Sequence, residues 1–253
     1  MDIIVLVSET VDTEEDIVIE DKGLVDHDGL THILNPYDEY AVEEAMLLKE
    51  SFGGTVTALT VGPQQSEEIL RHVLALGVDQ VVRIDPGERF LDAYVVATCL
   101  AQAIRKYPFD ILLAGNVSID YGSGQVGPRV AETLGIPCAV AAVNIKIEQN
   151  QAVVIRELDG RDDTLQMPLP CLITAQQGLN EPRYATLQGM IKAKKKPITT
   201  VSANDLLEGS GDLQPQITVV RQFQPAKRGE TRIFSGEPDQ QVQELLPLLD
   251  TNQ

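Results

Sequence analysis

The segment DILLAGNVSIDYGSGQVGPRVAETLG, residues 110–135, joins a short apolar run, a glycine-rich loop and a helix-like stretch. Residues 110–114, which are apolar after Asp110, are typical of a strand that is buried on both faces. Residues 125–134 have the pattern of a short helix, and Gly135 follows as a C-cap. A strand that leads into a helix is the repeating unit of α/β proteins with a parallel sheet. The segment therefore predicts that fold class.

The same alternation recurs on the N-terminal side of this segment. Further strands are expected at residues 3–7, 55–61 and 80–84. Helices are expected between them, from Asn35-Pro36 onward, at residues 66–76 and at residues 91–107. Together these elements predict an open parallel sheet with helices on both faces, the Rossmann-like architecture of adenine-nucleotide-binding domains.

The pattern changes after residue 139 to short alternating strands. They are expected at residues 143–148, 152–158, 164–167 and 171–175, and they predict an antiparallel extension of the sheet. After about residue 200 the chain is rich in Gln, Pro, Gly and acidic residues. We therefore expect an α/β domain at residues 1–199 and an extended C-terminal arm at residues 200–253, with a terminal helix at residues 242–249.

The composition excludes several classes of protein. A net charge of −18 over 253 residues disfavours nucleic acid as the main partner, because phosphate binding needs a basic surface. No window approaches the roughly 18 apolar residues that cross a membrane, so we expect no membrane insertion and a cytoplasmic protein. Cys99, Cys138 and Cys171 form no CxxC pair, and the three histidines lack metal-ligand spacing. Neither a disulfide nor a zinc site is expected.

The loop Gly122–Gly127 matches the pattern GxGxxG before a helix. Seven residues separate it from the preceding strand, which disfavours an NAD fingerprint, and no GK[ST] marks a phosphate-hydrolysing loop. Converging backbone N–H groups at a helix N-terminus still favour an anion. A tight turn without a ligand remains an alternative, but a nucleotide that is held and not hydrolysed fits the loop better.

Four places in the predicted sheet converge on one crevice. Ligands of open α/β sheets lie beyond the carboxyl ends of the strands. The places are near Leu6, residues 35–38, Val61 and residues 120–127. No nucleophile–base pair or metal cluster is visible among them. The crevice therefore predicts nucleotide binding without catalysis by side chains.

A compact basic run stands out in this acidic chain. The stretch LNEPRYATLQGMIKAKKKPI, residues 179–198, places four lysines behind several apolar residues. The proline at 182 favours extended backbone before it, so we expect a loop at residues 183–189 with Leu187 at its tip. Exposed apolar loop residues often mark partner contacts, whereas a solvated helix face is the simpler alternative.

Three motifs, in this order and spacing, resemble the β subunit of electron transfer flavoproteins. They are NPYDEYAVEEA at residues 35–45, SIDYGSGQVGPRVAE at residues 118–132, and LNEPRYATLQGMIKAKKKP at residues 179–197. The resemblance covers about residues 1–200. It implies a heterodimer with an α subunit that carries the redox-active FAD. It also implies an electron carrier and not an enzyme, one that accepts electrons from acyl-CoA dehydrogenases and passes them to a quinone-linked oxidoreductase or another acceptor.

The resemblance also implies site residues. A structural AMP would be bound at positions that match the family's crevice: Leu6, Asn35, Pro36, Tyr37, Asp38, Val61, Asp120, Tyr121, Gly122, Ser123, Gly124, Gln125, Val126, Gly127, Pro128, Arg129, Val130 and Ala131. The family's recognition loop corresponds to residues 183–190, and Leu187 matches the leucine that anchors a dehydrogenase. Partner docking would involve Arg183, Tyr184, Leu187 and Met190, together with Glu157, which matches a carboxylate that influences release of the flavin domain.

Some residues depart from the family's pattern and leave alternatives open. Electron-bifurcating members bind a second FAD in place of AMP and usually carry a DGDTAQVGP loop, where this chain has DYGSGQVGP. The arm sequence QFQPAKRGETRIF, residues 222–234, nevertheless looks similar to bifurcating members. AMP is favoured over a second FAD. Gln188 replaces a common proline after the anchor leucine. A stand-alone adenine-nucleotide sensor is the alternative from another class.

Overall fold

The computed structural model describes residues 1–19, 25, 29–208, 213–226, 229 and 231–249. The chain divides into two compact units. The first consists of Met1–Asp16 and His27–Thr218, and the second of Ile17–Asp26 and Val219–Gln253. The first unit contains the large sheet, and the candidate site lies within it.

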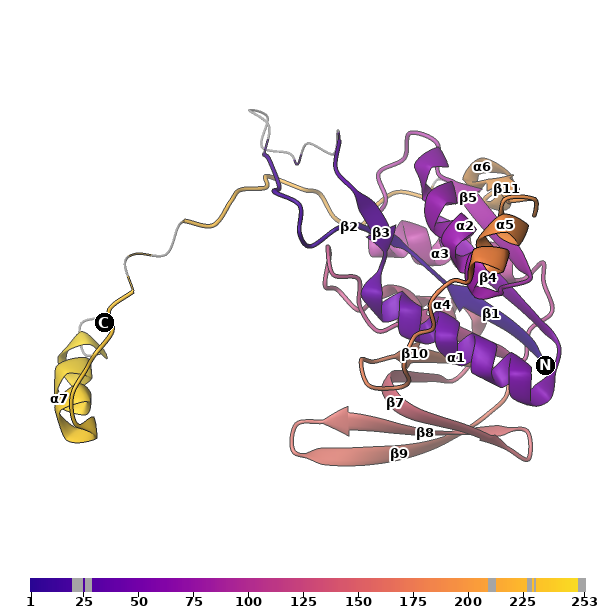
Figure 1. The fold of residues 1–253 in the computed structure, drawn as a ribbon. Helices are drawn as coiled ribbons and strands as arrows, with labels where there is room; N and C mark the ends of the chain where they lie inside the picture. Colours follow the sequence, from indigo (N-terminus) through magenta and orange to yellow (C-terminus); the bar gives the residue numbers. More distant parts are fainter. Residues whose placement is uncertain (20–24, 26–28, 209–212, 227–228, 230, 250–253) are drawn as a thin grey trace. The chain divides into compact units, whose positions relative to one another are not determined.

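Nine strands of the described residues form the large sheet of the first unit (Figure 1). They are β1 (Asp2–Leu6), β4 (Thr55–Val61), β5 (Gln80–Asp85), β6 (Ile111–Gly115), β7 (Cys138–Glu148), β8 (Gln151–Leu158), β9 (Arg161–Pro168), β10 (Cys171–Ala175) and β11 (Thr199–Ser202). Their order across the sheet is β11-β5-β4-β1-β6-β10-β7-β8-β9. All pairs from β11 to β7 are parallel, and β8 and β9 extend the sheet as an antiparallel pair.

Helices cover both faces of this sheet because neighbouring strand residues point to opposite faces. The first layer contains α1 (Pro36–Phe52), α2 (Glu67–Leu76) and α5 (Leu187–Ala193), and it packs with Ile3 and Val5 of β1 in one apolar cluster. The second contains α3 (Ala93–Ile104), α4 (Val126–Leu134) and α6 (Ala203–Leu206), and it packs with Ile4 and Leu6 in another. The predicted fold class is confirmed.

Helix α1 illustrates how the local sequence fixes these elements. Pro36 occupies its first turn, where a missing N–H costs nothing, and Asp38 and Glu39 complement the positive end of the helix dipole. One face of the helix is apolar and fully buried: Ala41, Val42, Ala45, Met46 and Leu48. Helix α1 is thereby fixed against β1 and β6 and places its N-terminus beside the carboxyl ends of both strands.

Five elements differ from the sequence-based expectation. Residues 171–175 were expected in the antiparallel extension, but β10 is buried throughout and lies parallel between β6 and β7. Strand β11 and helix α6 were not predicted, and β11 pairs with β5 at the edge of the sheet. A small antiparallel sheet of β2 (Glu9–Val11) and β3 (His32–Leu34) was also missed.

The second unit contains α7 (Pro238–Leu249). This helix confirms the terminal helix expected at residues 242–249, although none of its residues is buried. Its apolar side chains are exposed: Val242, Leu245, Leu246, Leu248 and Leu249. An apolar helix face without cover is typical of a segment that buries its surface on a partner.

Candidate functional site

The site lies where the direction of the sheet connections reverses. From β1 the chain continues through β4 to β5 on one side, and it returns through α3 to β6 on the other side of β1. Such a switch point opens a crevice beyond the carboxyl ends of the two central strands. A cavity of about 370 Å³ lies there, a size within the range of small-molecule sites, roughly 300–1,000 Å³.

The cavity brings together most of the residues that the sequence suggested for nucleotide binding. Those that line it are Leu6, Asn35, Asp38, Val61, Asp120, Tyr121, Ser123, Gly124, Gln125, Val126, Gly127 and Arg129. The remainder lie outside the lining: Pro36 and Tyr37 in the first turn of α1, Gly122 in the loop, and Pro128, Val130 and Ala131 in α4. Val130 and Ala131 are buried in the second apolar cluster.

Sequence reasoning missed a second group of lining residues. They are Val7, Ser8, Glu9, Gly62, Pro63, Leu91, Asp92, Ala93, Tyr94, Val96, Leu100, Ala114, Gly115, Asn116, Val117, Ser118, Gln216 and Ile217. Val7, Gly62 and Asn116 directly follow strands, so their positions carried a usable signal. The residues from α3 look like ordinary core positions, and residues 216–217 lie far along the chain, so neither had such a signal.

Asp38 and Asn35 build the wall of the cavity by bonding to backbone. The Asp38 carboxylate accepts hydrogen bonds from the Ser8 N–H at 2.7 Å, the Ser8 hydroxyl at 2.8 Å and the Gly115 N–H at 3.0 Å. The Asn35 amide donates to the Val117 carbonyl at 2.9 Å and accepts from the Ile119 N–H at 3.3 Å. These bonds tie α1 to the ends of β1 and β6.

Gly115 permits this close approach between α1 and β6. A Cβ atom at this position would lie 2.2 Å from Oδ1 of Asp38 and 2.8 Å from the Tyr37 backbone. Backbone atoms cannot move aside cheaply, so a side chain at Gly115 would separate α1 from β6.

The glycine loop presents an uncapped helix N-terminus to the cavity. Gly122 and Gly124 have φ angles of 61° and 59°, the left-handed region that glycine adopts without strain. Helix α4 has no side-chain cap, which leaves its first N–H groups available to an anion. Arg129 lies one turn further on and donates to the side chain of Gln125 at 2.9 and 3.1 Å. The N-terminus of α4 therefore offers N–H donors to an anion.

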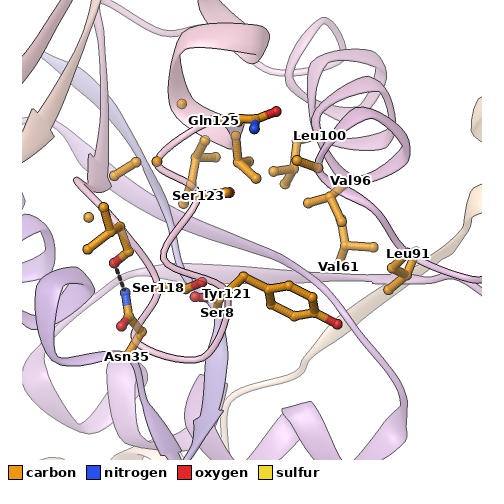
Figure 2. Close-up of a pocket in the computed structure, with 18 of the residues that line it drawn as sticks. Ser8, Asn35, Val61, Leu91, Val96, Leu100, Ser118, Tyr121, Ser123 and Gln125 are labelled. Carbon is orange, nitrogen blue, oxygen red and sulfur yellow. Dashed lines mark hydrogen bonds between the residues drawn. The ribbon is translucent and has the colours of Figure 1, made fainter. Parts of the chain in front are cut away.

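The opposite side of the cavity is apolar. Figure 2 shows Val61, Leu91, Val96 and Leu100 gathered on one side, away from Asn35 and Ser118. Tyr121 lies at the margin of the cavity with 68% of its surface exposed. An apolar wall that faces an uncapped helix N-terminus suits a base at one end of a ligand and a phosphate at the other. The residues present therefore fit an adenine nucleotide.

The residues suggested for partner docking lie elsewhere on the first unit. Leu187 is the first residue of α5, and its side chain is 71% exposed. The hydroxyl of Thr186 caps this helix by accepting from the Gly189 N–H at 3.0 Å. The expectation of a loop through residue 189 was thus wrong in its second half, because a capped helix begins at Leu187. Tyr184, which precedes the helix, is 96% exposed, and Met190 and Ile191 are exposed within α5.

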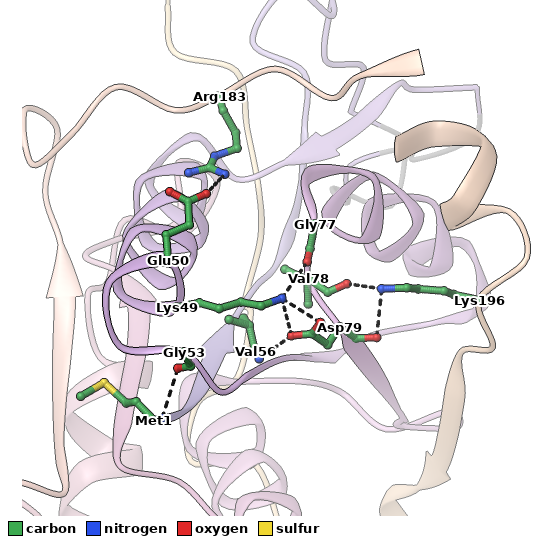
Figure 3. Close-up of polar contacts among 10 residues, drawn as sticks. All are labelled: Met1, Lys49, Glu50, Gly53, Val56, Gly77, Val78, Asp79, Arg183 and Lys196. Atoms are coloured by element: carbon green, nitrogen blue, oxygen red, sulfur yellow. Dashed lines mark hydrogen bonds and ion pairs between the residues drawn. The ribbon is translucent and has the colours of Figure 1, made fainter. Parts of the chain in front are cut away.

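Polar contacts fasten both flanks of this segment. Arg183 pairs with Glu43 at 2.7 Å and with Glu50 at 2.6 Å, both on α1. The side chain of Lys196 donates to the carbonyls of Val78 and Asp79 at 2.7 and 3.2 Å. Figure 3 shows the Glu50 and Lys196 contacts on opposite sides of the Lys49–Asp79 ion pair. Of the four lysines, Lys196 therefore supports the base of the segment.

Comparison with known proteins decides the family. The sequence model of one protein family, described as the electron transfer flavoprotein domain, matches residues 22–206. The electron transfer flavoprotein subunit beta of Bacillus subtilis is 45% identical over 98% of this chain and 97% of its own length. The chain belongs to the electron transfer flavoprotein family. The mouse subunit beta is 39% identical over 82% of each chain. The caffeyl-CoA reductase–Etf complex subunit CarD of Acetobacterium woodii is 33% identical over 93% of this chain and 92% of its own.

Membership in the electron transfer flavoprotein family indicates the kind of protein to which this site belongs. The relatives are named as subunits of an electron carrier, so the chain is a carrier subunit and not an enzyme. The part of the chain that the structure describes contains no cluster of three potential metal ligands. Among the same residues, no helix is long and apolar enough to cross a membrane.

Glu157, the remaining suggested docking residue, lies on β8 and is paired in register with Asp162 of β9.

Proposed function

We propose that this chain is the β subunit of a heterodimeric electron transfer flavoprotein with AMP in its crevice. The heterodimer takes electrons from acyl-CoA dehydrogenases in the cytoplasm and delivers them to a quinone-linked oxidoreductase or another acceptor. The α subunit carries the FAD that is reduced and reoxidised. The cavity at the β1–β6 switch point is the observation that carries the proposal, because it combines an uncapped helix end with an apolar wall.

The residues of this chain serve the carrier by binding and positioning. The N-terminus of α4 holds the phosphate, and the apolar wall excludes water from the base. Asn35 and Asp38 keep the loops around the ligand in place through their backbone hydrogen bonds. No chemical step by side chains is required.

Leu187 is the proposed anchor for a dehydrogenase. It is exposed on a capped helix. Arg183 ties the preceding segment to α1, and Arg71 of α2 donates to the carbonyl of Ala193 in α5, so docking costs little ordering entropy. Burying one leucine contributes about 1.5–3 kcal/mol. That range suits a transient complex in which a carrier must leave each donor quickly.

The anchor is tested by Leu187→Ala in the heterodimer. Electron transfer from an acyl-CoA dehydrogenase at low carrier concentration should slow roughly tenfold, because the apolar contact is lost. The nucleotide content should stay unchanged. Leu47→Ala on α1 is the matched control, since Leu47 is also an exposed leucine. Unchanged transfer by Leu187→Ala would reject the anchor role.

A second FAD in the crevice is the alternative within the family. It is favoured by the likeness to the CarD subunit over 93% of this chain and by the arm sequence at residues 222–234. The purified heterodimer is denatured, and the released nucleotides are identified and counted. One AMP and one FAD support the simple carrier, whereas two FAD molecules support an electron-bifurcating flavoprotein.

A stand-alone adenine-nucleotide sensor is the alternative from another class. The same cavity could serve such a module without redox chemistry. Tagged chain is purified from cells that also express the α subunit. A stable yellow complex with that subunit supports the carrier, and a colourless chain that binds AMP alone supports the sensor.

A further inference from the structure

Asp92 is a buried carboxylate that joins two distant parts of the cavity wall. It is only 4% exposed and caps the N-terminus of α3, where its Oδ1 atom accepts from the Val95 N–H at 2.8 Å. Its Oδ2 atom accepts from the N–H groups of Gln216 and Ile217 at 2.5 and 3.2 Å. One side chain therefore binds backbone groups that are more than 120 residues apart in sequence.

The segment that Asp92 holds forms part of the nucleotide cavity. Both Gln216 and Ile217 line the cavity together with the apolar residues of α3. Leu213, at the start of the same segment, packs against the second apolar cluster. The segment itself has no strand or helix among its described residues. Its place on the wall therefore depends on these few attachments.

The chemistry of Asp92 makes the attachment strong. A buried carboxylate is costly unless hydrogen-bond donors surround it, and hydrogen bonds to a charged group are stronger than neutral ones. Burial raises the pKa of Asp92, but the donors from Val95, Gln216 and Ile217 lower it by more. Releasing residues 216–217 would remove two of these donors and open one side of the cavity.

We propose that Asp92 is a positioning residue that fastens Gln216 and Ile217 over the nucleotide, so that the ligand is retained only while this segment is attached to α3. The proposal rests on the proposed nucleotide site. Linkage requires the reverse effect as well: a bound nucleotide that touches Ile217 stabilises the attached segment.

The test uses the purified heterodimer and radiolabelled AMP. Asn is as good a helix N-cap as Asp, so Asp92→Asn keeps the cap of α3 through its remaining oxygen. It replaces the Oδ2 acceptor with an NH₂ group, which repels the two backbone donors. We expect AMP to dissociate roughly tenfold faster, the change that one charged hydrogen bond supports. Ile217→Ala keeps the hydrogen bonds and should also speed dissociation. Val220→Ala, at a 91% exposed position outside the cavity lining, is the control and should dissociate at the wild-type rate.

Hydrogen exchange separates positioning from a general structural effect. In the wild type, AMP should slow exchange of the Gln216 and Ile217 amides. In Asp92→Asn this protection should be lost while the amides of α3 keep theirs. Wild-type dissociation rates in both Asp92→Asn and Ile217→Ala would overturn the proposal and leave the nucleotide site intact. A wild-type heterodimer that binds no nucleotide would overturn the proposed function as well.

Discussion

Asp38 is a buried carboxylate whose titration affects the stability of the protein. Burial raises its pKa from 3.8 to about 6, although donors from Ser8, Asn35 and Gly115 oppose the shift. Between about pH 4 and pH 6 the folded state therefore binds a proton more tightly than the unfolded state. The contribution of Asp38 to the free energy of unfolding must fall as the pH rises through this window.

This pH dependence can be measured with Asp38→Asn. A pKa shift of about two units corresponds to roughly 3 kcal/mol in the free energy of unfolding. The wild type loses this contribution between pH 4 and pH 7, whereas the variant does not. The stability of the wild type relative to the variant should therefore fall by roughly 3 kcal/mol as the pH rises from 4 to 7. Denaturant unfolding at several pH values tests this expectation. Parallel stability profiles for the two proteins would contradict it.

The role of Asp38 also shows what sequence reasoning could reach at the level of single residues. Its place at the start of a helix that follows the first parallel strand indicated the crevice, and Asp38 does line the cavity. Its actual partners are backbone groups at Ser8 and Gly115. Such contacts depend on how strands pair, so no local pattern could indicate them.

At the scale of an element, α5 is held by contacts with both neighbouring helices. Arg183 bonds to α1, and the side chain of Arg71 on α2 donates to the carbonyls of Ala193, at 2.8 Å, and Lys196. Gly189 passes so close to α2 that a Cβ atom there would lie 2.3 Å from the carbonyl oxygen of Ala75. The helix that carries Leu187 is therefore presented in a fixed position.

Arg183→Gln should make the position of α5 less fixed. Glu43 is buried and would lose its charged partner, which is costly. In an assay with an acyl-CoA dehydrogenase, we expect the KM for the heterodimer to rise severalfold with little change in kcat. Docking becomes weaker, whereas electron transfer within the docked complex is unchanged. Arg161→Gln on the exposed hairpin is the control. An unchanged KM for Arg183→Gln would show that α5 keeps its position without this contact.

The alternation of strands and helices made the first half of the fold predictable. Thr55–Val61 was predicted with its observed bounds, and α1 with its start at Asn35-Pro36. Strand β10 was assigned to the wrong part of the sheet because five consecutive buried residues follow a hairpin and look like its continuation. Strand β11 is half exposed and polar, so hydrophobic pattern alone could not find it.

At the scale of the whole molecule, the two units differ in how their residues are buried. Both apolar clusters consist of residues from the first unit. In the second unit, α7 has twelve residues, contains Pro247, and has none buried. Isolated helices of this length are marginal in water. Stability should therefore be distributed unevenly along the chain.

Hydrogen exchange of the free chain tests this distribution. Amides of α7 should exchange within the first time points, whereas those of β1 and β6 should exchange only through global unfolding. Addition of the α subunit should slow exchange in α7 if the helix docks there. Protection of α7 in the free chain comparable to that of β1 would contradict the expectation.

Strand β10 has a consequence for the synthesis of this protein. It lies between β6 and β7, although it follows both of them and the β8–β9 pair in the chain. A nascent chain that ends before residue 171 cannot join the two halves of its sheet, and it leaves an apolar edge of β6 unpaired. Exposed edges of this kind pair with other chains. Translation between β6 and β10 is therefore the interval in which this protein most needs protection from aggregation.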